Sequence, residues 1–280
     1  MKKGKENRVK IAKTLRKYTA VYTLALQNAM VYKVDFFISL VSGGFTIVIQ
    51  FFLWTAIYGG AEDAELFGYN YGQMVLYVVM AGIMGKYIQT GFEYDIMEDI
   101  MEGNMNRFFV QPIGHLAYRI VGFLGFKTME NIMVILISAV LLWIISVTAG
   151  ITFSIINILI LLLIAPLSLM INCMLFYCLS VTNFWLTWGW GIFNGARVVT
   201  TILSGGIFPL DVFGEPAMVI LRLLPFQYIA YFPLSVAVGN IQGVDILKGV
   251  LMQVIWIIVF YLISQPLWKI GMKKYIAARG

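Results

Sequence analysis

Long runs of apolar residues, each sufficient to cross a lipid bilayer as a helix, constrain this chain more than any other feature. A hydrocarbon core about 30 Å thick needs about 20 residues of helix. Six stretches reach this length, and they run approximately over Phe36–Tyr58, Gln73–Phe92, Thr128–Val147, Ile155–Val181, Phe184–Gly206 and Ile246–Ile270. Because 60% of the residues are hydrophobic and only 12% are charged, a water-soluble core could not hide this surface. The sequence therefore predicts an all-α integral membrane protein with six transmembrane helices.

The distribution of charge predicts which side of the membrane each loop faces. Eight basic residues fall within the first 17 positions, and four more fall within the last 12. The loop after the first apolar stretch holds Glu62, Asp63 and Glu65 and no basic residue. Because Lys and Arg gather on the cytoplasmic side, both chain ends are expected to be cytoplasmic, and an even number of crossings agrees. Nucleic-acid binding is the alternative interpretation of the basic runs, but both runs directly flank apolar segments.

The segment Pro216–Val238 is also apolar and long enough to cross. Pro225 and Pro233 interrupt it, however, and Arg222 lies near its middle. Proline removes a backbone donor and clashes with the preceding helical turn, and a crossing here would put the basic C-terminus outside. We therefore expect a re-entrant pair of short helices on the outer side. A kinked seventh span is the alternative.

The residues Lys10–Tyr32 are predicted to form an amphipathic helix in the plane of the membrane surface. Its apolar positions recur at helical spacing, and they are Ile11, Leu15, Tyr18, Tyr22 and Leu26. Lysines lie towards the other side, a pattern typical of interfacial helices. An ordinary cytoplasmic tail is the alternative.

The sequence offers no pattern for catalysis or for a metal. His115 is the only histidine, so a multi-histidine metal site is excluded. The nearest fragment to a phosphate-binding loop is Gly85–Lys86, but Tyr87 stands where a Ser or Thr is required. We therefore expect no catalytic residue, no metal and no cofactor in this chain.

A short acidic segment between the second and third stretches is the most informative cytoplasmic feature. Its apolar residues Ile96, Met97, Ile100 and Met101 share one face of a helix, and Gly103–Asn104 offers a helix stop. The remaining face is acidic, with Glu93, Asp95, Glu98, Asp99 and Glu102. Such a helix, on the side where positive charge usually gathers, is predicted to dock a partner. A solvated loop helix without a partner is the alternative.

Two of the predicted crossings carry a polar face. In the fifth, the residues at helical spacing are Asn183, Thr187, Gly191, Asn194, Arg197, Thr201 and Ser204. In the first they are Asp35, Ser39, Ser42, Thr46 and Gln50. A charge at the middle of a membrane is costly, so Arg197 is expected to face a partner or a wet cavity. Small and polar residues also mediate helix packing, so a translocation path and a dry helix–helix seam both stay open.

The chain resembles the permease subunits of bacterial ABC exporters, in the type-2 ABC permease family. The resemblance rests on the basic N-terminal helix, the six spans, and the string DIMEGNMNRFFVQPI at 99–113. A second, more specific string is SGGIFPLDVFGEPAMVILRLLPFQYIAYFPLSVAVG at 204–239. The resemblance implies a single permease domain over 1–280. Residues 1–35 would be a cytoplasmic tail and interfacial connecting helix, 36–270 the six-span bundle, and 271–280 a second tail.

The resemblance also implies partners and a mechanism. Two separate ABC ATPase subunits would bind ATP and Mg, and a second permease copy or sister chain would complete the complex in the bacterial plasma membrane. The acidic helix would be the coupling helix, with Asp95, Ile96, Glu98, Asp99, Ile100, Glu102, Gly103, Asn104 and Arg107 at the ATPase. The first and fifth spans would lie near the dimer interface and path. The re-entrant pair would close the exit, with Pro209, Arg222, Pro225, Phe226 and Pro233 as its gate.

The rival functions predict features that the sequence lacks. An ion-coupled secondary transporter would require buried carboxylates, and the last four stretches have none in their apolar interiors. An intramembrane enzyme would require a catalytic acid, a base or a metal cluster. A structural or receptor-like membrane subunit is the third alternative. The aromatic-rich spans favour an amphiphilic substrate.

Overall fold

Helices make up the fold that the computed structural model describes. The described residues are 2–30, 33–59, 65–106, 108, 114–150, 153–186 and 188–279, and the side chains of 2–13, 33–42, 148–149 and 278–279 lie outside the description. Within these residues the only β-type pairing is an isolated bridge between Leu66 and Tyr69. The α-helices are α1 (Lys2–Ala29), α2 (Lys33–Tyr58), α3 (Tyr71–Ile88), α4 (Phe92–Glu102), α6 (His115–Ala149), α7 (Ile155–Val181), α8 (Trp190–Leu203), α9 (Glu215–Leu221), α10 (Tyr231–Ala237) and α11 (Val244–Arg279). Short 3-10 helices are η1 (Asn104–Asn106), η2 (Thr182–Phe184), η3 (Leu210–Phe213) and η4 (Phe226–Tyr228).

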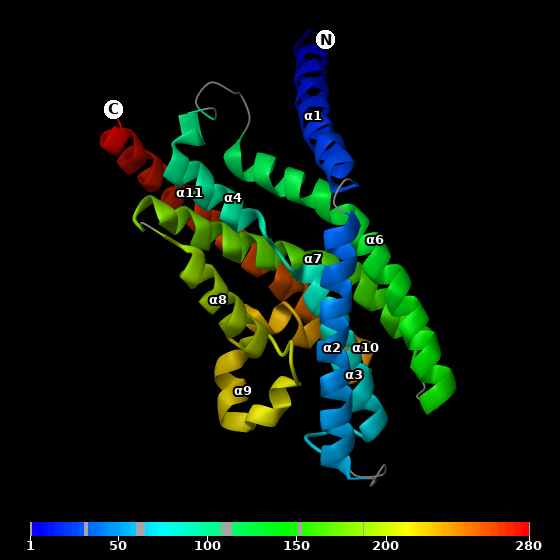
Figure 1. Ribbon diagram of the computed structural model, residues 1–280. Helices are drawn as coiled ribbons and strands as arrows, with labels where there is room; N and C mark the ends of the chain where they lie inside the picture. The colour runs from blue at the N-terminus through cyan, green and yellow to red at the C-terminus, as the bar shows by residue number, and fades with distance from the viewer. Residues whose placement is uncertain are drawn as a thin grey trace.

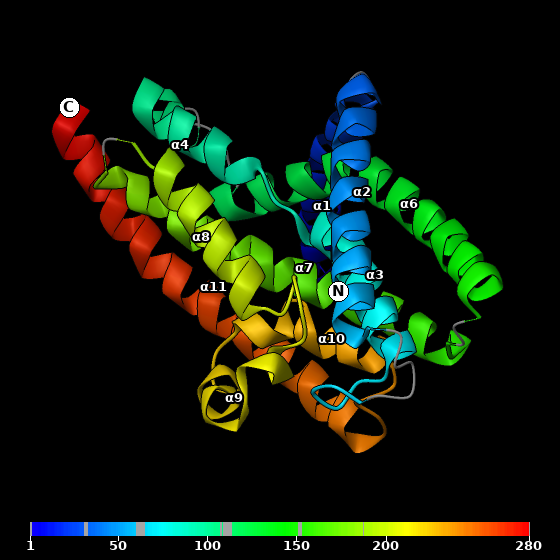
Figure 2. The same cartoon turned by 60° about the horizontal axis from the view of Figure 1, so that its bottom comes forward.

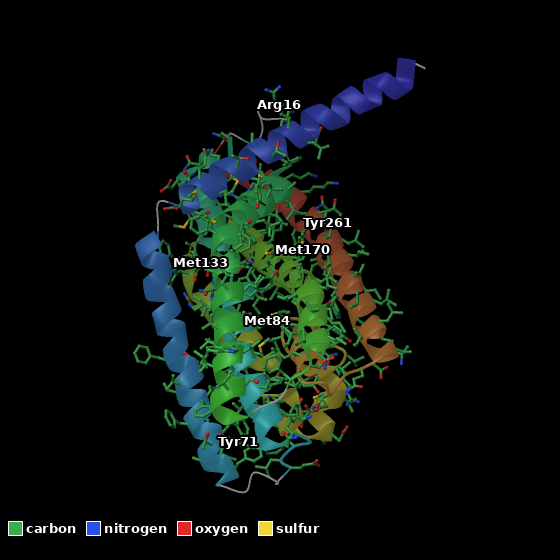
Figure 3. The ribbon with its side chains drawn as sticks, turned by 90° about the vertical axis from the view of Figure 1, so that its right-hand side faces the viewer. Arg16, Tyr71, Met84, Met133, Met170 and Tyr261 are labelled. Carbon is green, nitrogen blue, oxygen red and sulfur yellow. The ribbon has the colours of Figure 1, made fainter. Side chains whose placement is uncertain are left out.

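The long helices run up and down between two ends of the molecule. Figure 1 shows α4 and both chain ends at one end, which we call the α4 end, and α9 at the other, which we call the α9 end. The helices α2, α6 and α8 run away from the α4 end, and α3, α7 and α11 return to it. Figure 2 shows α11 lying along α7, against which it packs. In the side view of Figure 3, Arg16 on α1 lies at the α4 end and Tyr71 at the opposite end.

Four helical segments in the described part are long and apolar enough to cross a membrane. They are Tyr71–Glu102, which takes in both α3 and α4, His115–Val147, Ile155–Phe184 and Val244–Ala277. Large apolar side chains such as Leu136, Trp143, Leu247 and Leu262 are exposed on α6 and α11, as expected of surfaces in contact with lipid. The helix α2 has 26 residues, and the part of it whose side chains are described, Gly43–Tyr58, is a shorter apolar helix. Six crossings therefore stay a prediction.

The fifth predicted crossing differs from the expected continuous helix over Phe184–Gly206. Among the described residues, α8 is helical only from Trp190 to Leu203, which is 14 residues. At the end of α7 the Thr182 hydroxyl donates to the Leu179 carbonyl and the Asn183 amide donates to the Ser180 carbonyl, which satisfies carbonyls at that helix end. The 3-10 turn η2 follows there, and α8 begins only at Trp190.

The segment Pro216–Val238 contains two short helices instead of one long one. Both α9 and α10 have seven residues, which is about 10 Å of helix. A kinked seventh span would need a helix more than twice as long. The turn between α9 and α10 includes η4 and is held by the Gln227 amide, which donates to the Arg222 carbonyl over 2.8 Å.

The helix α1 packs closely along α6 instead of lying free. The Tyr22 hydroxyl and the Thr128 hydroxyl lie 2.8 Å apart. A Cβ added at Gly125 would lie 2.5 Å from the Tyr22 carbonyl oxygen, whereas one at Gly122 would lie 3.8 Å from its nearest neighbour, Val21. The absence of a side chain at Gly125 therefore lets the two helix backbones approach.

Candidate functional site

A short non-helical segment separates α3 from α4 and lies at the centre of the candidate site. The residues Gln89, Thr90 and Gly91 between the two helices are not helical, and Gln89 has φ −57° and ψ 128°. The helix α4 then ends at Gly103, which has φ 87° and donates its backbone N–H to the Asp99 carbonyl. A left-handed conformation of this kind favours glycine, which explains the helix stop seen in the sequence.

The apolar face of α4 packs inside the chain. Ile96 and Ile100 are buried in a cluster with Leu169, Cys173 and Tyr177 of α7. Ile96 and Ile100 are thus covered by α7 of the same chain, and their predicted contact with another protein stays a prediction. Asp99 is covered as well, with 7% of its surface exposed. Sequence periodicity found the face correctly but could not tell which protein covers it.

The acidic residues of α4 divide into an inner and an outer set. Glu93 and Asp99 are buried, while Asp95, Glu98 and Glu102 are exposed. Met101 and Asn104 are exposed beside Glu98 and Glu102. Within the outer set Asp95 also pairs with Arg119, whereas Glu98 and Glu102 are exposed at the surface of α4; Arg107 lies outside the described residues.

Arg119 of α6 holds the middle of α4. Its guanidinium forms ion pairs with Asp99 and, over 3.4 Å, with Asp95. Arg119 and Asp99 have only 11% and 10% of their side chains exposed, so this contact is largely shielded from water. No sequence pattern singled out Arg119, because its partners Asp95 and Asp99 lie 24 and 20 positions earlier in the chain.

Arg197 of α8 finds its partner at the start of α4. Its Nη2 donates to Glu93 Oε1 over 2.5 Å, and its Nη1 donates to the Thr90 carbonyl over 3.1 Å. The Thr90 hydroxyl also donates to Glu93 Oε1 over 3.3 Å. Arg197 was expected to face a partner or a wet cavity, and it faces Glu93 of the same chain. Glu93 belongs to the predicted acidic docking helix.

Aromatic rings surround this ion pair. The Arg197 guanidinium lies 5.4 Å from the ring centre of Phe176 and 6.0 Å from that of Tyr94, within the range of cation–π attraction. The Tyr94 hydroxyl donates to Asn194 Oδ1 over 3.3 Å, and its ring packs edge-on against Phe193. The pair thus lies in a low-dielectric setting that strengthens it.

The predicted polar faces are only partly assembled. Asn194, Arg197 and Thr201 share a face of α8, and the Thr201 hydroxyl donates to the Arg197 carbonyl. Asn183 does not belong to this face, because it caps the end of α7. Ser204 lies just after α8 and is buried. Thr187 and the side chains of Ser39 and Ser42 lie outside the description, and Thr46 is exposed on α2.

A cluster of tyrosines around Asp211 holds the α9 end together. The hydroxyls of Tyr69 and Tyr231 both donate to the Asp211 carboxylate over 2.9 Å. Burial raises the pKa of Tyr69, so its hydroxyl stays protonated as a donor. The Tyr77 hydroxyl donates to the Gly205 carbonyl over 2.8 Å. The sequence analysis missed this cluster, whose members are far apart in the chain.

The residues predicted as an outer gate lie in and around this cluster. Pro209, Pro225 and Pro233 are buried, Phe226 is half-buried and Arg222 is exposed. Arg222 therefore does not sit inside the helix bundle, as a position in the middle of a span would have required.

A cavity of about 790 Å³ opens between α1, α4 and α6. Its walls combine apolar side chains such as Leu24 and Phe126 with polar ones such as Asn28 and Lys127. The Lys127 ammonium is already paired with Glu130 over 2.8 Å. Among the described residues no three His, Cys, Asp or Glu side chains gather as metal ligands.

Comparison with protein-family models gives a match over most of the chain. The model of a family described as ABC-2 family transporter protein matches residues 45–279 of the chain. No curated protein matches it. The matched range begins in α2 and ends with α11, and it includes α4, α8 and the cluster around Asp211.

Proposed function

The chain belongs to the ABC-2 family of transporter proteins and is an ABC permease subunit embedded in a membrane, and we propose that it exports an amphiphilic substrate with energy from separate ATPase subunits. The permease family is a transport component and not itself catalytic. ATP and Mg would be bound by the partner ATPase, with two copies in each complex. The observation that carries the proposal is the exposed acidic surface of α4, projecting from a helix that is anchored to the bundle on its other side.

The proposed docking surface consists of Glu98, Met101, Glu102 and Asn104. These side chains are exposed at the end of α4, and the buried Ile96 and Ile100 hold the helix against α7. A rigid helix with an acidic outer face is suited to a basic cleft on an ATPase. Charge complementarity of this kind contributes to partner choice and to the rate of association.

The proposed orientation puts the α4 end in the cytoplasm and the α9 end outside. Its support is the gathering of basic residues near both chain termini, which lie at the α4 end in Figure 1, together with the preference of Lys and Arg for the cytoplasmic side. In this arrangement α9 and α10 form the outer gate. The exposed apolar faces of α2 and α8 would meet a second permease, identical or a sister chain.

The proposed substrate class follows from the cavity between α1, α4 and α6. Its lining places aliphatic and aromatic groups beside charged and amide groups, and its volume of about 790 Å³ is that of a site for a drug-sized or lipid-sized molecule. At the membrane surface, a molecule with an apolar body and a polar head fits such a lining better than a sugar or an ion.

Co-purification tests the docking surface. We expect the detergent-solubilised permease to retain its ATPase, and Glu98→Lys with Glu102→Lys to weaken that retention by about ten-fold through charge repulsion. The matched control is Glu215→Lys, an exposed acidic residue at the α9 end, which should leave retention unchanged. Transport by the purified chain alone, driven by an ion gradient, would instead establish the secondary-transporter alternative.

A further inference from the structure

We propose that α8 transmits the movement of α4 to the α9 end, and that the ion pair of Glu93 with Arg197 is the contact through which α8 receives it. The inference rests on the proposed function, since it takes α4 as the helix that an ATPase moves. It assigns to Glu93 and Arg197 a positioning role that is separate from docking and from substrate contact.

The ion pair joins α8 to the start of α4. The non-helical residues Gln89–Gly91 interrupt the hydrogen-bond ladder between α3 and α4. The Arg197 guanidinium binds this interruption at the Thr90 carbonyl and the first turn of α4 at the Glu93 carboxylate. A movement of α4 that carries Glu93 with it therefore displaces the Arg197 side chain.

Burial makes the contact difficult to break. Glu93 is fully buried, and the Arg197 side chain is 28% exposed. A buried carboxylate that loses its cation is strongly unfavourable, so α8 is expected to follow Glu93 instead of separating from it. The hydrogen bond from Tyr94 to Asn194, one turn earlier on α8, provides a second attachment on the same side.

Glu93 cannot serve the docking surface. Its side chain has no exposed area, whereas Glu98 and Glu102 on the same helix are exposed. The acidic residues of α4 thus have two roles, with the outer ones facing a partner and Glu93 facing α8.

The opposite end of α8 is attached to the α9 end. The backbone N–H of Tyr231 in α10 donates to the Ser204 carbonyl over 2.7 Å, and the Tyr77 hydroxyl donates to the Gly205 carbonyl over 2.8 Å. Six residues of α8 lie between Arg197 and Ser204, so the two positions are about 10 Å apart along the helix axis. An uninterrupted helix of this length moves as one body, so a shift at Arg197 reaches α10.

Gly205 lies in close contact with Tyr77 and Tyr231. Gly205 has φ +75°, and a Cβ at this position would lie 2.8 Å from the Tyr77 hydroxyl oxygen and 2.9 Å from Tyr231 Cβ. Only glycine meets both requirements without strain. The contact therefore holds the end of α8 against α3 and α10 in a fixed arrangement.

The test measures substrate transported per ATP hydrolysed by the complete complex in vesicles. We expect Glu93→Gln and Arg197→Gln each to retain the ATPase and its hydrolysis but to lower this ratio by about 5- to 150-fold, the usual size of coupling between sites. The exchanged pair, Glu93→Arg with Arg197→Glu, should recover part of the loss. An unchanged ratio in both single variants overturns the proposal.

A second variant covers the case in which the exchanged pair fails to fold. Tyr77→Phe removes only the hydroxyl that binds Gly205, at the other end of α8. If both contacts serve one route, Glu93→Gln combined with Tyr77→Phe should be no worse than the more severe single variant, whereas losses that multiply indicate independent effects and contradict the route.

The control separates this inference from the proposed docking. Glu98→Lys with Glu102→Lys should reduce ATPase retention while the ratio per hydrolysed ATP stays near that of the unchanged protein. If that double variant retains the ATPase fully, the docking surface is wrong. If Glu93→Gln releases the ATPase, the ion pair acts only by supporting α4, and the transmission role fails.

Discussion

At the scale of single residues, Arg119 offers a test of how α4 is held. Arg119→Gln would remove the guanidinium that pairs with the buried Asp99, and removing one member of a buried ion pair costs about 3 kcal/mol. We expect a lower unfolding temperature in detergent, measured by intrinsic fluorescence. Arg222→Gln is the matched control, because Arg222 is exposed and its loss should have little effect.

Asp211 gives a second prediction at this scale. Asp211→Asn keeps the shape of the side chain but removes the charge that accepts from Tyr69 and Tyr231, and a charge-assisted hydrogen bond is roughly twice as strong as a neutral one. We expect faster hydrogen exchange in 65–70 and in η3, with α4 unaffected. If the α9 end is equally protected from hydrogen exchange in Asp211→Asn and in the unchanged protein, the hydrogen bonds of the two tyrosines do not depend on the charge of Asp211.

At the scale of secondary-structure elements, two glycines in α6 should respond in opposite ways to the same substitution. Gly→Ala within a helix ordinarily stabilises by about 0.5–1 kcal/mol, and Gly122→Ala should do so because its nearest neighbour lies 3.8 Å away. Gly125→Ala would instead collide with the Tyr22 carbonyl and separate α1 from α6. Thermal unfolding of the two variants measures the difference, and stabilisation of both would mean that α1 does not pack as described.

The sequence predicted elements well where one periodic pattern dominated. The predicted stretch Ile155–Val181 coincides with α7, because an uninterrupted apolar run of that length leaves few alternatives. The predicted stretch Phe184–Gly206 matches α8 less closely, because α8 begins only at Trp190 and ends at Leu203. Apolar spacing continues through the residues before Trp190, so spacing alone does not locate the start of the helix.

The candidate site was predictable in its parts but not in its connections. Helical spacing singled out Arg197, and composition singled out the acidic segment at Glu93. The link between them joins residues 104 positions apart, and only the packing of α4 against α7 and α8 brings them together. For the same reason the spacing placed Ile96 on an apolar face but did not show that α7 covers it.

At the scale of the whole molecule, the orientation in the membrane can be measured directly. In intact cells, a thiol reagent that cannot cross the membrane should label Glu65→Cys and Glu215→Cys at the α9 end but not Glu98→Cys on α4. The native Cys173 is buried and Cys178 is partly buried in α7, so the unmodified protein supplies the background. The reverse labelling pattern would invert the proposed orientation and place α4 away from any cytoplasmic ATPase.

The shortness of α8 has a consequence for the surrounding bilayer. Its 14 helical residues span about 21 Å, which is shorter than a hydrocarbon core of about 30 Å. A helix shorter than its membrane draws the lipid headgroups inward or admits water beside it. As the fifth of the predicted crossings, α8 would therefore bring the polar layers of the membrane closer together beside Arg197 than a span of full length does.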